Sequence, residues 1–509
     1  MTPKALKRLH EAACFLRAYP QNASEQAEAR RTLAGFHRRP DLKRQSEALA
    51  DTGIAGTPIH YRLFWPMARW LAHRYPELLT IDWTEGEFAD RVAAVLPLLV
   101  PAAEAEGLRK AVLPARQAID RLRAQRETDA AFLIRRIETL PGGDAVREAT
   151  HDALDVAYRL EGSANGPSRT HAFFDGAPVA FGSGSPRRDR PELANELFVS
   201  PRSVRPLSPR DGARLVDLAR CAMVTRSRDL DAFAHGDPRD VRLVDDGDGL
   251  AFALIGVVPE RRLFLPAVYG ALTLRNGVPI GYVQLDVLFG NAEVSYNTFE
   301  TFRGGEARFV FCRLLAATRH VFGVSNFSIE PYQLGHGNEE GIASGAWWFY
   351  ARAGFRPRDP KVRSFARVEL RRRARDPLYR SNRRALLRLA TAHVFWSPEG
   401  KGSGVITPTT AIGFALARLE DHGRAAPRLG VRSVSGWTAG QRLWLKRWAP
   451  LLDALPGFNR WPHDERRALL RVVRAKGGRR ESEYARLFDA HPRLAAAVLA
   501  LGGRPPLMR

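Results

Sequence analysis

The residues best suited to chemistry lie between positions 292 and 355. Gly304 and Gly305 stand just before an amphipathic segment, 308–322, whose apolar spacing predicts a helix. Glycines at the mouth of a helix leave backbone N–H groups pointing outward, and these groups add to the positive end of the helix dipole. With Arg303 beside them, they would form a site for an anion such as a pyrophosphate. An ordinary strand-to-helix turn is the alternative, because GxxxxGK(S/T) is absent and this glycine pair does not fit GxGxxG.

A candidate general base lies on the strand predicted over 292–299. Alternation along this strand places Glu293, Ser295 and Asn297 on one face, opposite Val294, Tyr296 and Thr298. Glu293 is the first candidate for taking a proton from an ammonium substrate, and a solvated strand residue near a turn is the alternative. Other groups near the expected cleft that could act on protons or hold a cationic substrate are Glu300, Glu306, His336, Glu339 and Glu340.

Two motifs in this region resemble the GNAT superfamily of acyl-CoA-dependent N-acyltransferases. Gly305-Glu306-Ala307 matches the end of the family's (Gln/Arg)-x-x-Gly-x-(Gly/Ala) loop, and the run from Ala346 to Phe355 matches its Ala-x-x-x-Tyr-x-x-x-Gly-Phe helix. The resemblance covers residues 205–365, about a third of the chain. Phe302 stands where the family has Gln or Arg, and Ala343 stands where it usually has Asn.

The resemblance implies an acyl-CoA co-substrate, such as acetyl-CoA, between the strands 292–299 and 326–329. Its pyrophosphate would lie on the loop formed by Arg303, Gly304, Gly305, Glu306 and Ala307. An amine of unknown identity would attack the thioester, and Tyr350, at the family's tyrosine position, would protonate the leaving thiolate. Packing among Trp347, Trp348 and Phe349 is the alternative role for Tyr350.

The elements around these motifs indicate an α+β fold. Residues 1–160 have helical periodicity, and 161–204 form a Gly- and Pro-rich linker with at most a short hairpin and a basic cluster at Arg187, Arg188 and Arg190. Residues 205–370 begin with a helix and continue as an antiparallel meander, with strands at 250–258, 267–274 and 280–288 and an Asn276-Gly277 hairpin. Residues 371–509 are expected to form a basic helical region with a loop at 400–404. The prediction is a mixed, mostly antiparallel, GNAT-like sheet flanked by all-helical regions.

The charge of the chain points to a polyanionic partner. The 509 residues include 78 Lys and Arg against 55 Asp and Glu, a formal charge of +23. Eight of the basic residues are lysine and the rest arginine, a bias also expected of a GC-rich genome. Arginines cluster between Arg371 and Arg388, with Tyr379 among them and Trp396 beyond, a composition suited to tRNA or other nucleic acid. A solvated helix face is the alternative.

Other features narrow the environment. The cysteines, Cys14, Cys221 and Cys312, are too few and too scattered for a disulfide framework or a CxxC site. The histidines do not form HExxH, so no catalytic metal is predicted. No signal-peptide core or membrane-spanning run is found, which predicts a cytoplasmic protein without a membrane partner.

Three functions therefore stay open. The first is an N-acyltransferase that uses acyl-CoA. The second is a transferase that takes its acyl group from aminoacyl-tRNA, or an RNA-binding protein. The third is a non-catalytic interaction protein whose GNAT-like scaffold is degenerate, which the Phe302 and Ala343 departures motivate.

Overall fold

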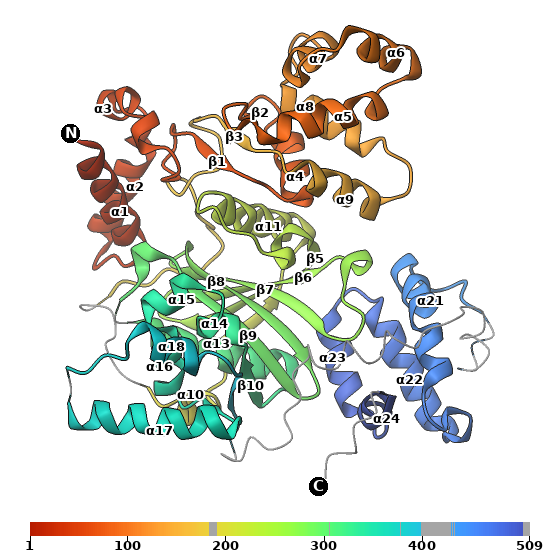
Figure 1. Ribbon diagram of the computed structural model, residues 1–509. Coiled ribbons are helices and arrows are strands. Elements are labelled where there is room, and N and C mark those ends of the chain that lie inside the picture. Colours follow the sequence, from red (N-terminus) through yellow and green to blue (C-terminus); the bar gives the residue numbers. More distant parts are fainter. Residues whose placement is uncertain are drawn as a thin grey trace. The chain divides into compact units, whose positions relative to one another are not determined.

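The computed structural model describes residues 1–182, 191–304, 306–376, 378–398, 429, 431 and 433–501. The chain forms two compact units: residues 1–175 with 217–235, and residues 176–216 with 236–509. Both helices and a large mixed sheet are present, so the α+β prediction is confirmed (Figure 1). None of the described helices is long and apolar enough to span a membrane.

The first unit combines helices with a small antiparallel sheet. Its strands β1 (Ile59–Tyr61), β2 (Leu79–Ile81) and β3 (Tyr158–Leu160) lie in the order β1-β3-β2. The prediction that residues 1–160 are all helical is therefore wrong. Each strand has only three residues, too few to show alternation, and β3 pairs with β1 across about a hundred residues of sequence. The helices are α1 (Pro3–Ala18), α2 (Ala23–Phe36), α3 (Pro40–Arg44), α4 (Trp65–Arg74), α5 (Ala89–Leu99), α6 (Ala102–Ala111), α7 (Ala115–Leu122), α8 (Asp129–Glu138), α9 (Asp144–Leu154) and α12 (Asp231–Ala234), and α11 (Pro209–Val224) contains the unit boundary.

The second unit is built on a nine-stranded sheet of order β11-β12-β10-β9-β8-β7-β6-β5-β4. All its pairs are antiparallel except β9 with β10. The predicted meander is confirmed, and Asn276 (φ 47°) and Gly277 (φ 79°) make the two-residue turn between β7 and β8 in the left-handed region that this dipeptide favours. The strands are β4 (Ser203–Pro206), β5 (Gly236–Gly247), β6 (Leu250–Val257), β7 (Ala267–Arg275), β8 (Val278–Leu288), β9 (Asn291–Thr298), β10 (Asn326–Ile329), β11 (Arg356–Pro357) and β12 (Val394–Trp396).

Four strands of this sheet, β4, β5, β11 and β12, match none of the predicted strands. β5 was missed because its sequence is rich in Asp and Arg and shows little apolar alternation. β12 lies in the region predicted to be all helical, and that prediction is wrong there: Val394 and Trp396 pair with Ile329 and Phe327 of β10. The described part of the predicted linker holds α10 (Leu193–Glu196) and the start of β4, whereas Arg187, Arg188, Arg190 and the loop 400–404 lie outside the described residues.

Helix α13 (Ala307–Phe322) anchors the loop that carries Arg303 and Gly304 to the sheet. It is the helix predicted over 308–322, and its Phe311, Leu314 and Leu315 are buried in the same core as Leu285 and Val294 of the sheet. Full burial of an apolar side chain of this size contributes about 1.5–3 kcal/mol. The remaining helices are α14 (Pro331–Leu334), α15 (Glu339–Ser344), α16 (Ala346–Arg352), α17 (Pro360–Arg375), α18 (Arg383–Leu389), α21 (Ala439–Ala454), α22 (His463–Lys476), α23 (Glu481–Ala490) and α24 (Leu494–Leu501).

Candidate functional site

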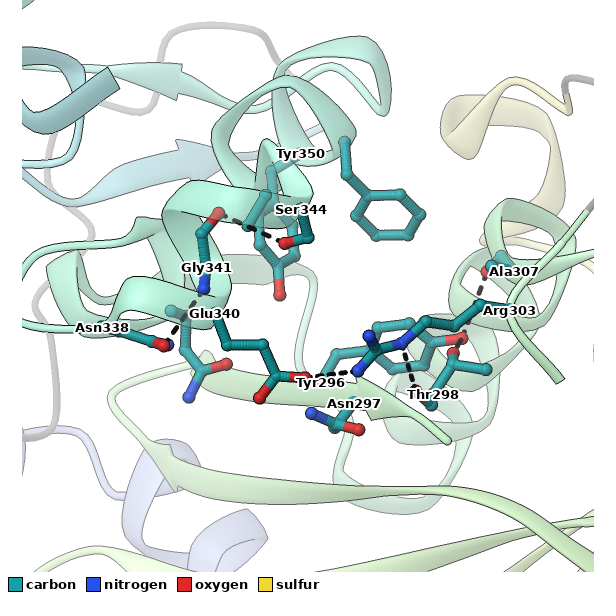
Figure 2. Close-up of a pocket in the computed structure, with 13 residues that line it drawn as sticks. Tyr296, Asn297, Thr298, Arg303, Ala307, Asn338, Glu340, Gly341, Ser344 and Tyr350 are labelled. Atoms are coloured by element: carbon teal, nitrogen blue, oxygen red, sulfur yellow. Dashed lines mark hydrogen bonds and ion pairs between the residues drawn. The ribbon is translucent and has the colours of Figure 1, made fainter. Parts of the chain in front are cut away.

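A cavity of about 200 Å³ lies beside the C-terminal half of β9. The strand forms its floor, the loop after β9 and the start of α13 form one side, and α14 to α16 form the roof (Figure 2). Its lining residues are Tyr296, Asn297, Thr298, Arg303, Ala307, Gln333, Asn338, Glu340, Gly341, Ser344, Ala346, Phe349 and Tyr350. The cavity therefore lies in the region that carries both motifs.

The cavity exists because β9 and β10 separate. Their parallel pairing joins only residues 291–293 to residues 326–328. β10 ends at Ile329, and Pro331, which has a fixed φ and no N–H, begins α14. β9 continues to Thr298 and pairs there with β8 alone. Beyond Glu293, one edge of β9 therefore offers backbone groups to the cavity instead of to a neighbouring strand.

Tyr350 projects from α16 into this opening. Its side chain is only 3% exposed and its ring packs edge-on against Phe311, with centroids 5.6 Å apart. Figure 2 shows its hydroxyl directed into the cavity, towards β9, and the hydroxyl accepts a hydrogen bond from the backbone N–H of Tyr296. Burial, and next the nearby Tyr296, raise the pKa of Tyr350 above its ordinary value. The phenol therefore keeps its proton at neutral pH, as a general acid requires.

Arg303 lies at the cavity with its charge already engaged. Its Nη2 pairs with Glu340 Oε1 at 2.5 Å, and its Nε donates to the Thr298 carbonyl oxygen at 3.0 Å. The side chain is 43% exposed, so an incoming anion can reach it. A phosphate-bearing ligand would have to displace Glu340 from the guanidinium, or share it.

Of the other residues of the predicted loop, some line the cavity and others do not. Ala307 lines the cavity, and its carbonyl oxygen accepts a hydrogen bond from the Tyr296 hydroxyl at 3.2 Å. Gly304 is exposed and does not line it, and Gly305 lies outside the described residues. Glu306 is buried, 4% exposed, and pairs with Arg275 of β7 at 3.1 Å. Glu306 is therefore fixed to the sheet, and it is not placed to contact a ligand in the cavity.

Glu293, the predicted base, is not in the cavity wall. It lies on the paired part of β9, where its Oε2 accepts a hydrogen bond from Ser328 Oγ at 3.4 Å and lies 3.3 Å from His393 Nε2. The structure therefore does not bring Glu293 to Tyr350 in one cavity. Of the other groups considered, Glu340 lines the cavity, Glu339 pairs with Arg383, and His336 and Glu300 are exposed.

Glu330, an acid closer to the cavity than Glu293, was not predicted from the sequence. Its carboxylate accepts hydrogen bonds from Ser295 and from Gln333, which lines the cavity. Burial, followed by the charge of Glu293, raises its pKa. A signal was present, because Glu330 directly follows the predicted strand 326–329, and side chains at strand ends often carry function.

Asp286 is a second missed acid. It lies on β8 directly opposite Glu293, and burial, followed by the charge of Glu293, raises its pKa to about 7. Like charges directly opposite one another destabilise a sheet. The free protein therefore holds Asp286 partly protonated at neutral pH.

This gives a prediction about stability. Between pH 4 and 7 the folded chain binds more protons at Asp286 than the unfolded chain, so the free energy of unfolding falls as pH rises through that window. Asp286→Asn carries no charge and is expected to raise the melting temperature at pH 8 while changing it little at pH 4. Thermal unfolding at the two pH values measures this, with the exposed Glu300→Gln as the control. An equal shift at both pH values would contradict it.

Comparisons of this chain with protein-family models, with curated proteins and with solved structures found no match. In the described part of the chain, no three or more His, Cys, Asp or Glu side chains are arranged to hold a metal ion.

Proposed function

We propose that the second unit is an N-acyltransferase that moves an acyl group from an acyl-CoA thioester to an amine. One observation carries the proposal: the buried, protonated Tyr350 hydroxyl points to the free edge of β9, where β9 and β10 separate. The GNAT-like helix motif around Tyr350 and the open first turn of α13 beside Arg303 support it.

The residues could divide the reaction as follows. The amine nitrogen attacks the thioester carbonyl carbon, a C–N bond forms, and the C–S bond then breaks. Tyr350 gives its proton to the departing sulfur, and solvent returns a proton to Tyr350 between turnovers. Backbone N–H groups on the free edge of β9 and in the first turn of α13 would stabilise the carbonyl oxyanion and the pyrophosphate. A carboxylate takes one proton from the incoming ammonium before the attack, and solvent takes the second nitrogen proton as the C–S bond breaks and the amide forms.

Calorimetric titration of the full chain with acetyl-CoA and with longer-chain acyl-CoAs tests the proposal. Saturable binding that Arg303→Ala weakens would support it. If no thioester binds, the acyl-CoA proposal fails, and the alternatives become an aminoacyl-tRNA donor or a non-catalytic scaffold.

The Arg303–Glu340 pair gives a prediction about affinity. Because Glu340 competes with phosphate for the Arg303 guanidinium, Glu340→Gln is expected to tighten acetyl-CoA binding by about fivefold, near the upper limit for an exposed ion pair. Glu339→Gln is the matched control, since it removes the same charge from the neighbouring residue of α15 but frees Arg383 outside the cavity. Equal tightening in both variants would show a general charge effect in place of competition at Arg303.

A basic surface favours a second candidate, a transferase whose donor is aminoacyl-tRNA. Arg363, Arg367, Arg371 and Arg375 are exposed and lie four residues apart along α17, and no carboxylate in the described ranges pairs with them. Like charges at this spacing weaken a helix, so folding does not account for the row. The segment after α17 contacts the roof of the cavity: Ser381 Oγ accepts a hydrogen bond from Trp348 Nε1 of α16.

Salt dependence tests this second candidate. Binding of tRNA through the exposed arginines of α17 is expected to weaken steeply as the salt concentration rises. The double variant Arg367→Ala/Arg371→Ala is expected to lower the slope of log K against log salt concentration by about two. If tRNA is not retained at low salt, or if the slope is unchanged, the candidate fails.

A further inference from the structure

The wall of the cavity holds one pair of opposite charges. Among the described residues that line it, Arg303 is the one cation and Glu340 is the one carboxylate. Figure 2 shows the Glu340 side chain reaching from the roof towards β9, where it meets Arg303 from the loop after that strand. Both side chains keep contact with solvent, and Glu340 is 37% exposed. A ligand in the cavity can therefore reach either charge, but the pair must open first.

The Glu340 carboxylate already accepts a cation in this structure. It accepts an N–H group of Arg303, and a carboxylate has two oxygens that together accept about four hydrogen bonds. Its capacity is therefore not limited to the contacts that it makes now. Asn297 adds an acceptor, because its side chain lines the same cavity and no described residue hydrogen-bonds to its amide. An ammonium group has three N–H donors, so it suits a cavity whose wall offers a carboxylate and amide oxygens.

Binding of an acyl-CoA would change the charge balance of the cavity. In the free protein, the lining residues carry one positive and one negative charge. A pyrophosphate at Arg303 takes the guanidinium from Glu340 and adds negative charge of its own, so the cavity then attracts a cation more strongly. The donor and an ammonium both need the Arg303–Glu340 pair to be open, and the ligand that binds first removes this cost for the other.

We propose that Glu340 holds the ammonium group of the acceptor, and that donor and acceptor each favour the binding of the other by separating Glu340 from Arg303. This rests on the proposed acyltransferase function. The two members of the ion pair have different ligands: Arg303 binds the phosphates and Glu340 binds the amine. Because linkage is reciprocal, the donor and the amine raise each other's affinity by the same factor. The pair is exposed, so we expect a factor of about five.

Calorimetric titration of the full chain with CoA, at rising concentrations of butylammonium chloride, tests this coupling. CoA carries the pyrophosphate but no acyl group, so no transfer takes place. Ordinary salt weakens the binding of a phosphate ligand by screening, whereas butylammonium is expected to tighten CoA binding about fivefold. Tetramethylammonium chloride, whose cation has no N–H donor, is the control at equal ionic strength and is expected only to weaken CoA binding.

Three variants locate the ammonium site. Glu340→Gln is expected to abolish the coupling, and Glu339→Gln, which frees Arg383 outside the cavity, is expected to keep it. Without CoA, Arg303→Ala is expected to bind butylammonium about fivefold more tightly than the wild type, because the guanidinium no longer competes for Glu340. Loss of a merely structural contact would not strengthen binding. Circular dichroism confirms that the variants are folded.

The proposal is overturned if butylammonium weakens CoA binding or leaves it unchanged, or if the wild type, Arg303→Ala and Glu340→Gln bind butylammonium equally. The direct titration with butylammonium uses no coenzyme, so the two proposals fail separately. If CoA does not bind at all, the acyl-CoA proposal fails and the direct titration alone decides whether Glu340 binds an ammonium. If CoA binds without coupling, the donor remains and only the role of Glu340 is removed.

Discussion

Replacing Tyr350 with phenylalanine is expected to lower the rate of acyl transfer by about a hundredfold or more, while the affinity for acetyl-CoA stays within about twofold. A positioned general acid typically contributes about 10²–10⁴ in rate. The substitution removes only the hydroxyl, and the ring keeps its contacts with Phe311 and Phe355. Steady-state turnover and calorimetric affinity, measured on the same preparation, separate the two effects.

Tyr296→Phe is the matched control for this prediction. Tyr296 lines the same cavity, but its hydroxyl is already used, since it accepts from Thr298 Oγ1 at 2.9 Å and donates to the Ala307 carbonyl oxygen. Its removal is expected to change turnover much less than Tyr350→Phe. If both variants lose activity equally, the cavity needs its aromatic hydroxyls for structure, and Tyr350 is not the acid.

The sequence carried enough local signal to predict the middle of the fold. Strands β6 to β9 have eight or more residues each and are separated by turns such as Asn276-Gly277, so apolar runs and turn chemistry predict them together. The three-residue strands of the first unit and β12 have no such local signal. They form because distant segments pair, and β5 forms although its composition is charged, because it pairs with β6.

The candidate site was predictable only in part, for the same reason. Tyr350, Arg303 and Ala307 come from local motifs and reach the cavity. Glu306 was predicted from its place in the loop, but Arg275, thirty-one residues earlier, holds it away from the cavity. Glu293 lies on the paired part of β9, and Glu330 lies closer to the cavity, because the pairing of β9 and β10 stops after three residues. The point at which this pairing stops depends on where β10 ends. Pro331 was the one local sign of that end.

The largest effect on stability is expected at Glu481, the first residue of α23. This carboxylate is 0% exposed, pairs with Lys476 Nζ at 2.6 Å and lies 3.8 Å from Arg262 Nε. Lys476 also donates to the carbonyl oxygen of Pro266 at 2.9 Å, so the cluster joins α22 and α23 to the segment before β7. Removing one partner of a buried ion pair leaves an uncompensated charge, which costs about 3–5 kcal/mol.

Glu481→Ala is therefore expected to lower the free energy of unfolding of the second unit by about 3–5 kcal/mol. Denaturant unfolding followed by tryptophan fluorescence measures it, because the buried Trp444 and Trp448 lie nearby. The exposed Glu483→Ala, two residues along the same helix, is the control and is expected to stay within about 0.5 kcal/mol of the wild type.

The pH dependence of Glu481→Ala distinguishes a buried charge from a simple packing defect. Burial already lowers the pKa of Lys476 to about 8, and Glu481 opposes that shift, so the variant lowers it further. Between that folded value and the unfolded value of 10.5 the unfolded chain binds more protons, and the free energy of unfolding rises with pH. The loss in free energy of unfolding caused by Glu481→Ala is therefore expected to be larger at pH 6 than at pH 9. At pH 6, Lys476 must either stay charged in the core without its partner or lose its proton at a cost in free energy. A deficit that is the same at both pH values would show that Glu481 acts through packing alone.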